Sequence, residues 1–144
     1  MQTKLQQHQF VVNGRIEVFR VSDGAHACSM CSYGSGPAQI SGWGSVALDG
    51  QGNVVMADCG NDRMQVLRCS DGVHLRTTGS KDSGAAQFNT PFGVAFDSAG
   101  NIIVADTNNF RVQVLRYSDG RHVRIIGSRG SRRTVVRMSL LRFD

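Results

Sequence analysis

The chain has 144 residues, 40% of them hydrophobic and 19% charged, which is the composition of a globular domain and not of a disordered chain. Residues 1–128 hold 11 Lys and Arg against 10 Asp and Glu, so most of the +5 net charge lies in residues 129–144, and the main part gives no argument for nucleic acid. No apolar run approaches the about 20 residues of a membrane-spanning helix and no secretory signal is visible, so a cytoplasmic protein without membrane contact is expected.

Residues 1–14 match none of the strand patterns that follow and are assigned to a polar N-terminal segment. The first pattern is Arg-Ile-Glu-Val-Phe-Arg at residues 15–20. It returns as Arg-Met-Gln-Val-Leu-Arg at 63–68 and as Arg-Val-Gln-Val-Leu-Arg at 111–116, and each copy leads into Ser-Asp-Gly and a histidine. The spacing from Arg15 to Arg63 equals that from Arg63 to Arg111, and a fixed period of this length, about 48 residues, is the mark of a repeat architecture.

Each full unit contains four short apolar and β-branched runs separated by Gly, Asn and Asp, which are strand and turn signals. The runs lie at 15–21 and 25–31 in the first unit, at 45–49, 53–58, 63–69 and 73–78 in the second, and at 92–97, 101–106, 111–117 and 121–126 in the third. No segment has convincing helical periodicity. The pattern predicts an all-β fold, a partial β-propeller built of four-stranded antiparallel blades, with a half blade at 15–31 and blades at 44–79 and 92–127.

The third unit closely resembles the NHL repeat, through Phe-Asn-Thr-Pro-Phe-Gly-Val-Ala-Phe-Asp at 88–97, Gly-Asn-Ile-Ile-Val-Ala-Asp at 100–106 and Asn-Phe-Arg-Val-Gln-Val at 109–114. The second unit carries this signature more loosely, and the resemblance covers about residues 10–128. It implies a propeller, commonly of six blades, of which residues 15–128 would supply about two and a half. Three expectations stay open: the chain is a fragment, it associates with a second copy or another repeat protein through open blade edges, or it folds as a short open array.

Two pairs of charged residues recur with the period. Asp58 and Arg63, and likewise Asp106 and Arg111, are five residues apart across a tight turn, so we expect an ion pair inside each blade. The alternative is a ring of charges that meets a ligand. These residues are predicted to stabilise the blades.

The recurring histidines could suggest a zinc site, because three histidines can hold a catalytic zinc ion. However, His26, His74 and His122 flank the fourth, outermost strand of each unit. At about 4.8 Å per strand, this position lies about 20 Å from a propeller axis, so histidines of neighbouring blades are too far apart to share an ion. No metal and no cofactor are expected.

Four cysteines allow a zinc site or two disulfides. One period later, however, Cys28 is replaced by Arg76, Cys59 by Thr107 and Cys69 by Tyr117, and Cys31 is replaced by a glycine. Because the other units tolerate different residues at these positions, four free thiols are expected.

The sequence contains no nucleophile–base pair and no phosphate-binding loop, so the leading hypothesis is a non-catalytic protein-binding scaffold. Propellers usually bind through the face where the loops of successive blades converge. The links between blades, such as residues 81–89, should lie on this face together with the turns between second and third strands. The candidate partner-binding residues in these turns are Asn61, Asp62, Asn108, Asn109 and Phe110. The family resemblance also implies a role in ubiquitination, as the substrate-recognition part of a ubiquitin-ligase-like protein.

Two other functions are kept as alternatives. The first is RNA binding through the basic C-terminal tail at residues 129–144, which carries Arg129, Arg132, Arg133 and Arg137. The main part of the chain has neither the clustered cations nor the stacking aromatics that RNA binding needs. The second is a metal-dependent lyase-type propeller, which would need a metal ion near the axis.

Overall fold

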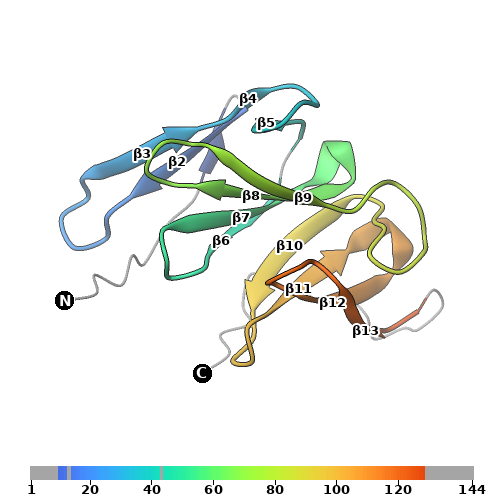
Figure 1. The fold of residues 1–144 in the computed structure, drawn as a ribbon. Coiled ribbons are helices and arrows are strands. Elements are labelled where there is room, and N and C mark those ends of the chain that lie inside the picture. The colour runs from blue at the N-terminus through green and yellow to red at the C-terminus, as the bar shows by residue number, and fades with distance from the viewer. Residues whose placement is uncertain (1–9, 13, 43, 129–144) are drawn as a thin grey trace.

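The computed structural model describes residues 10–12, 14–42 and 44–128. These residues form an all-β structure in which three antiparallel sheets follow one another, as Figure 1 shows. Two short 3-10 turns, η1 (Cys59–Asn61) and η2 (Thr107–Asn109), are the helical segments of this part of the chain. Neither is long enough to cross a membrane. The basic tail at 129–144, with the arginines proposed to contact RNA, lies outside the described residues.

The second and third sheets have four strands each, in chain order and antiparallel, as predicted for propeller blades. The second sheet consists of β6 (Val46–Leu48), β7 (Asn53–Asp58), β8 (Arg63–Arg68) and β9 (His74–Thr78). The third consists of β10 (Pro91–Phe96), β11 (Asn101–Asp106), β12 (Arg111–Arg116) and β13 (His122–Ile126). The register between the two inner strands repeats with the period, because Asp58 faces Arg63 as Asp106 faces Arg111.

The first sheet has one strand more than the two expected from the sequence. It consists of β1 (Phe10–Val12), β2 (Arg15–Phe19) and β3 (His26–Met30). β1 takes the place of a second strand, but only two residues separate it from β2, whereas four separate β7 from β8. Because of this shorter turn, Arg15 pairs with Val12, whereas Arg63 pairs with the residue five positions before it. The 48-residue period therefore does not place this strand. Short strands β4 (Ser32–Tyr33) and β5 (Gln39–Ile40) then pair in parallel.

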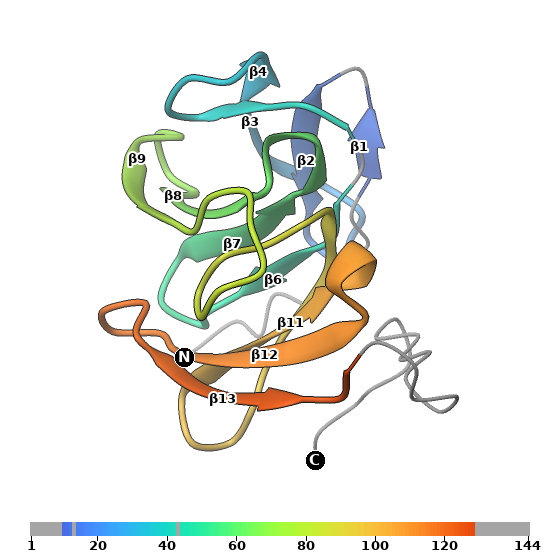
Figure 2. The ribbon, with the colours of Figure 1, turned by 90° about the vertical axis from the view of Figure 1, so that its right-hand side faces the viewer.

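The middle sheet is covered on both faces. Five of the six residues of β7 and four of the six residues of β8 are buried. A strand with one face in solvent buries only alternate residues. The continuous burial therefore agrees with Figure 2, in which this sheet lies between the other two.

Two hydrophobic cores join the sheets, and they use the same repeat positions. The first contains Ile16 and Val18 of β2, packed with Val46, Val54, Met56 and Leu67 of the second sheet. The second contains Met64 and Val66 of β8, packed with Val94, Ile102, Val104 and Leu115 of the third sheet. Each member of the second group follows its counterpart by one period. The interface between blades is thus repeated as faithfully as the blades themselves.

A substitution at Gly79, at the end of the second sheet, tests the packing between the second and third sheets. Its backbone has φ +93°, and a Cβ atom added there would lie 2.4 Å from the ring of the buried Phe88. The equivalent position in the first unit holds Cys31, also at positive φ, but Ile40 replaces the phenylalanine. We expect Gly79→Ala to lower the free energy of unfolding by about 1–3 kcal/mol in urea titrations, because the added methyl group overpacks the core.

Gly100→Ala is the matched control, because Gly100 also has positive φ but open space around its Cα. It isolates the backbone strain from the clash. The pair Gly79→Ala and Phe88→Ile reproduces the side-chain sizes of the first unit more closely, so its combined effect should be smaller than the sum of the two single effects by about 1 kcal/mol or more. Strict additivity would mean that the ring is not what excludes a side chain at Gly79.

Candidate binding face and the network that builds it

One end of the sheets gathers the linkers between blades and the turns between second and third strands. We call residues 33–41, 59–62, 81–90 and 107–110 the loop face. Asn109 of the η2 turn donates its Nδ2 proton to the carbonyl oxygen of Asp82 in the linker, at 2.9 Å. Asn61 of η1 does the same to Gly34 at 2.9 Å. These contacts place linkers and turns on a common surface, as predicted from the sequence.

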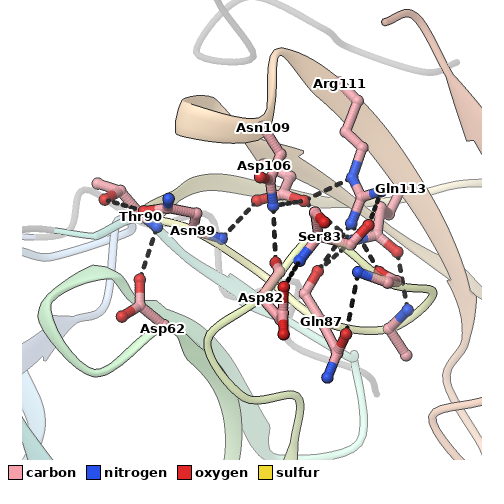
Figure 3. Close-up of polar contacts among 12 residues, drawn as sticks. Asp62, Asp82, Ser83, Gln87, Asn89, Thr90, Asp106, Asn109, Arg111 and Gln113 are labelled. Carbon is pink, nitrogen blue, oxygen red and sulfur yellow. Dashed lines mark hydrogen bonds and ion pairs between the residues drawn. The ribbon is translucent and has the colours of Figure 1, made fainter. Parts of the chain in front are cut away.

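The carboxylate of Asp106 is the centre of this region in the third unit (Figure 3). Its side chain is 0% exposed and forms an ion pair with Arg111 Nε at 2.7 Å. It also accepts hydrogen bonds from the backbone N–H of Asn89 at 2.8 Å, from Asn109 Nδ2 at 3.0 Å and from Gln113 Nε2 at 3.0 Å. Four donors around one buried carboxylate satisfy its acceptor capacity, which makes burial of the charge tolerable.

Arg111 and Gln113 connect this carboxylate to the linker. The guanidinium donates to the carbonyl oxygens of Ser83 and Gly84, each at 2.7 Å, and to that of Gln87 at 3.0 Å. Gln113 donates to the same carbonyl of Gln87 at 2.6 Å and accepts from the N–H of Ala86 at 3.0 Å. The linker has little regular structure, so these side chains replace the backbone partners that a strand would provide.

The second unit builds the same network. Asp58 pairs with Arg63 Nε at 2.8 Å, so both pairs expected from the sequence are present inside the blades. Arg63 donates to Ser35, Gly36 and Gln39 in the preceding linker. The roles of the buried Gln65 and Gln113 were not predicted from the sequence. These glutamines recur one period apart in strand interiors that are otherwise apolar, and this recurrence could have indicated their role.

Four of the five predicted partner-binding residues use their side chains inside the protein. Asn61 and Asn109 donate to the buried carboxylates and linker carbonyls. Asp62 accepts a 2.7 Å hydrogen bond from the N–H of Thr90 in the next linker, and Asn108 donates to the Thr90 hydroxyl at 2.9 Å. These four residues hold the loop face together, whereas the fifth, Phe110, is 48% exposed.

Phe110 and a hollow formed by the linker and Asn109 are two exposed features of the loop face in the third unit. Phe110 ends the η2 turn in the left-handed region, at φ 55° and ψ 40°, with its N–H donated to Thr107. The hollow has a volume of about 440 Å³ and is lined by Lys81, Asp82, Ser83, Asn89 and Asn109. The equivalent of Lys81 in the second unit is Tyr33, which is 74% exposed. The two units therefore offer different side chains at one backbone position.

The comparisons with known proteins agree with this geometry. Residues 88–115 match the family model of the NHL repeat. This match lies within the third unit. Among solved structures, the chain is similar to a protein of unknown function from Bacteroides caccae, with a TM-score of 0.58 and 15% sequence identity. The match covers 78% of this chain and 38% of that one, so the chain spans less than half of its length, and the likeness concerns the fold alone. No curated protein matches the chain.

The matched NHL segment contains most of the network, from Phe88 in the linker to Leu115 in β12. Asp106, Arg111 and Gln113 all lie within it. The polar residues of the matched segment, and their counterparts one period earlier, therefore tie a blade to the linker that precedes it. This structural role is sufficient to explain their recurrence without a ligand.

The recurring histidines lie apart from the loop face, at the start of the last strand of each sheet. His26 Nε2 pairs with Glu17 at 2.8 Å and with the Ser29 hydroxyl, and His74 Nε2 bonds the Thr77 hydroxyl at 2.7 Å. Near His122 of the third sheet, Ile125 takes the place of that hydroxyl. Within the ranges that the structure describes, no three His, Cys, Asp or Glu side chains gather closely enough to hold a metal ion.

The expectation of four free thiols is wrong for two cysteines, because Cys28 and Cys69 form a disulfide between the first and second sheets. One period later, at the joint between the second and third sheets, their counterparts are Arg76 and Tyr117. The Arg76 guanidinium lies 5.2 Å from the centre of the Tyr117 ring and donates to its carbonyl oxygen. The two positions thus touch at both joints, and only their chemistry differs.

Cys31 and Cys59 remain thiols. Burial, together with the nearby negative charge of Asp58, raises the pKa of Cys31 to about 12. The thiolate, which is the reactive form, is therefore not populated near neutral pH. Cys31 packs against the core between the first two sheets and has a structural role.

Tyr117 gives the second joint a further contact. Its hydroxyl donates to Asp49 of the second sheet at 2.8 Å. Burial, reinforced by this carboxylate, raises the pKa of Tyr117 to about 12. For Asp49, burial opposes ionisation, but hydrogen bonds from Asn53, Gln51 and Tyr117 outweigh it and hold the pKa of that carboxyl below its usual value. The pair therefore stays in its hydrogen-bonded form at neutral pH.

Proposed function

We propose that this protein is a non-catalytic, propeller-like scaffold whose loop face binds a segment of a protein partner. The observation that supports this best is the hollow at Lys81, Asn89 and Asn109, on the same loop face as the exposed ring of Phe110. It offers the Lys81 cation, the Asp82 carboxylate and the Asn89 amide for polar contacts. An exposed aromatic residue is a typical anchor of protein interfaces.

The rigidity of this surface favours binding. The linker that forms the wall of the hollow is held by Arg111 and Gln113, and the turn that carries Phe110 is held by Asn109. A surface that is already ordered loses little conformational entropy when a partner docks. This is the arrangement expected of functional loops positioned by a stable scaffold.

The type of partner follows from the sequence rather than from the geometry. The resemblance to NHL propellers supports a place as the substrate-recognition part of a ubiquitin-ligase-like protein. The RNA-binding alternative is supported by the five arginines in residues 129–144. The loop face itself favours protein, because Arg63 and Arg111 use their guanidinium groups on linker carbonyls and on buried carboxylates.

The loop face can be tested with a phage-displayed library of random peptides selected on the purified protein. Selected peptides should lose affinity by about tenfold or more in Phe110→Asp and in Lys81→Glu, as measured by calorimetry. Aspartate is chosen at position 110 because Asp62 has the same backbone conformation one period earlier, so the variant should fold. Its effect then reports the loss of the ring.

Ser98→Ala is the control, because Ser98 lies in the β10–β11 turn at the opposite end of the sheet and should leave peptide affinity unchanged. Equal losses in all three variants would exclude the loop face. A single-stranded RNA probe is measured in parallel. If no peptide is selected, and RNA affinity falls with salt and disappears when 129–144 is deleted, the RNA-binding alternative replaces this proposal.

A further inference from the structure

The two joints between sheets are built from equivalent residue pairs. In the first joint Cys28 of β3 is bonded to Cys69, and in the second Arg76 of β9 contacts Tyr117. A second pair lies beside the first at each joint. A Cβ added to Gly72 would lie 3.4 Å from Met30, and a Cβ added to Gly120 would lie 2.7 Å from Thr78. Both pairs of the second joint follow those of the first by one period.

The same positions occur once more at each end of the three sheets, where they have no partner sheet among the described residues. On the third sheet the next positions are Arg124 and Ile126 of β13, and both are exposed, Ile126 by 47%. The described residues contain no fourth antiparallel sheet that could supply the partners of Arg124 and Ile126. The partner positions one period before Cys69 and Gly72 are Val21 and Gly24, on the far side of the first sheet.

The far side of the first sheet is open at these positions. Val21 is 49% exposed, although its counterparts Cys69 and Tyr117 are partly buried. Phe19 is 36% exposed, whereas the equivalent Leu67 is fully buried. A Cβ added to Gly24 would meet no atom within 4 Å. The described part of the chain thus leaves the outer-strand positions of a joint exposed at each of its two ends.

We propose that two copies of this chain join head to tail, with the first sheet of one copy docked on β13 of the other. In this contact, Val21 and Gly24 belong to the copy whose first sheet docks, and Arg124 and Ile126 belong to the copy that presents β13. Val21 then lies opposite Arg124, and Gly24 lies opposite Ile126. This inference stands independently of the loop face. The contact is heterologous, since each copy uses a different surface at each end, and such contacts build rings or filaments according to the rotation between copies.

The chemistry of the two surfaces agrees with this arrangement. The joint brings Phe19, Val21 and Ile126 out of water, as the internal joints do for Leu67, Leu115 and Met30. The aliphatic stem of Arg124 can pack on Val21 while its guanidinium reaches the backbone, as that of Arg76 reaches the carbonyl of Tyr117. The contact involves the outer strand β13, because Val112 and Val114 of the neighbouring strand β12 are already buried, at 6% and 3% exposure.

The native disulfide provides the test. The variant Val21→Cys/Arg124→Cys places cysteines at the position pair that is bridged by Cys28 and Cys69. Under mild oxidation, this variant should give covalent species of two or more chains of 15.6 kDa each on non-reducing gels, at about tenfold higher yield than either single variant. The single variants can bridge identical positions, which the head-to-tail arrangement keeps apart, or can bridge to the native thiols Cys31 and Cys59, and their yield therefore measures this background.

Val21→Cys/Ile125→Cys is the matched control, because Ile125 is the neighbour of position 124 and points to the opposite face of its strand. It should give no more cross-linked product than the wild type. Circular dichroism of the reduced variants verifies folding, and sedimentation of Ile126→Asp without added cysteines should show a shift toward monomer. A folded Val21→Cys/Arg124→Cys variant that stays monomeric, or a control that cross-links equally, would overturn the proposal.

Discussion

Replacing Asp106 with alanine should lower the free energy of unfolding by about 3–5 kcal/mol. The Asp106 side chain is fully buried, and its removal leaves the guanidinium of Arg111, which is only 10% exposed, without its counter-charge. The amides of Gln113 and Asn109 and the N–H of Asn89 lose an acceptor at the same time. Unsatisfied buried donors cost more than the hydrogen bonds contribute when formed, so the loss should be large. Urea titration followed by circular dichroism measures it.

Asp119→Ala is the matched control for this prediction. Asp119 also forms an ion pair, with Arg116, but its side chain is 38% exposed, so solvent screens the pair and the loss should be much smaller. Hydrogen exchange adds a local readout, because the amide protons of Ala86 and Asn89 should lose protection in Asp106→Ala and keep it in Asp119→Ala. Similar effects of the two substitutions would show that the buried carboxylate does not hold the linker.

The contrast between these two aspartates shows what the sequence could predict about the network. The five-residue spacing from Asp106 to Arg111 across a turn was enough to predict the ion pair, because both residues belong to one hairpin. The linker contacts were out of reach, since Arg111 meets Ser83 and Gly84 at separations of 28 and 27 residues, through backbone carbonyls that carry no sequence signal. The same limit explains why Asn61 and Asn109 were predicted to bind a partner.

The cysteines show a different limit of reasoning from a repeat. The replacement of Cys28 by Arg76 and of Cys69 by Tyr117 was interpreted as tolerance, and therefore as the absence of an interaction. At both joints between the described sheets, these two positions contact each other. The pair changes together, from a disulfide to an arginine on an aromatic ring. Single positions compared along the chain do not reveal this, whereas pairs of positions do.

Removing the disulfide with Cys28→Ser/Cys69→Ser should lower the free energy of unfolding by about 3–4 kcal/mol under oxidising conditions, because the bridge closes a 41-residue separation and restricts the unfolded chain. The wild type measured with a reducing agent should lose a similar amount. The double variant itself should respond little to the reducing agent, since Cys31 and Cys59 are not bridged. Urea titration in both conditions gives the four values.

The variant Cys28→Arg/Cys69→Tyr transfers the chemistry of the second joint to the first and separates a role in packing from a role in cross-linking. An arginine stacked on a tyrosine contributes about 0.5–2 kcal/mol, so this variant should be more stable than the double serine variant by about that amount, and its stability should be independent of redox conditions. It should remain below the oxidised wild type, because it does not restrict the unfolded chain. If it is no more stable than the double serine variant, the two joints are not equivalent. The head-to-tail contact between copies, which assumes the same equivalence at Val21 and Arg124, would then lose its basis.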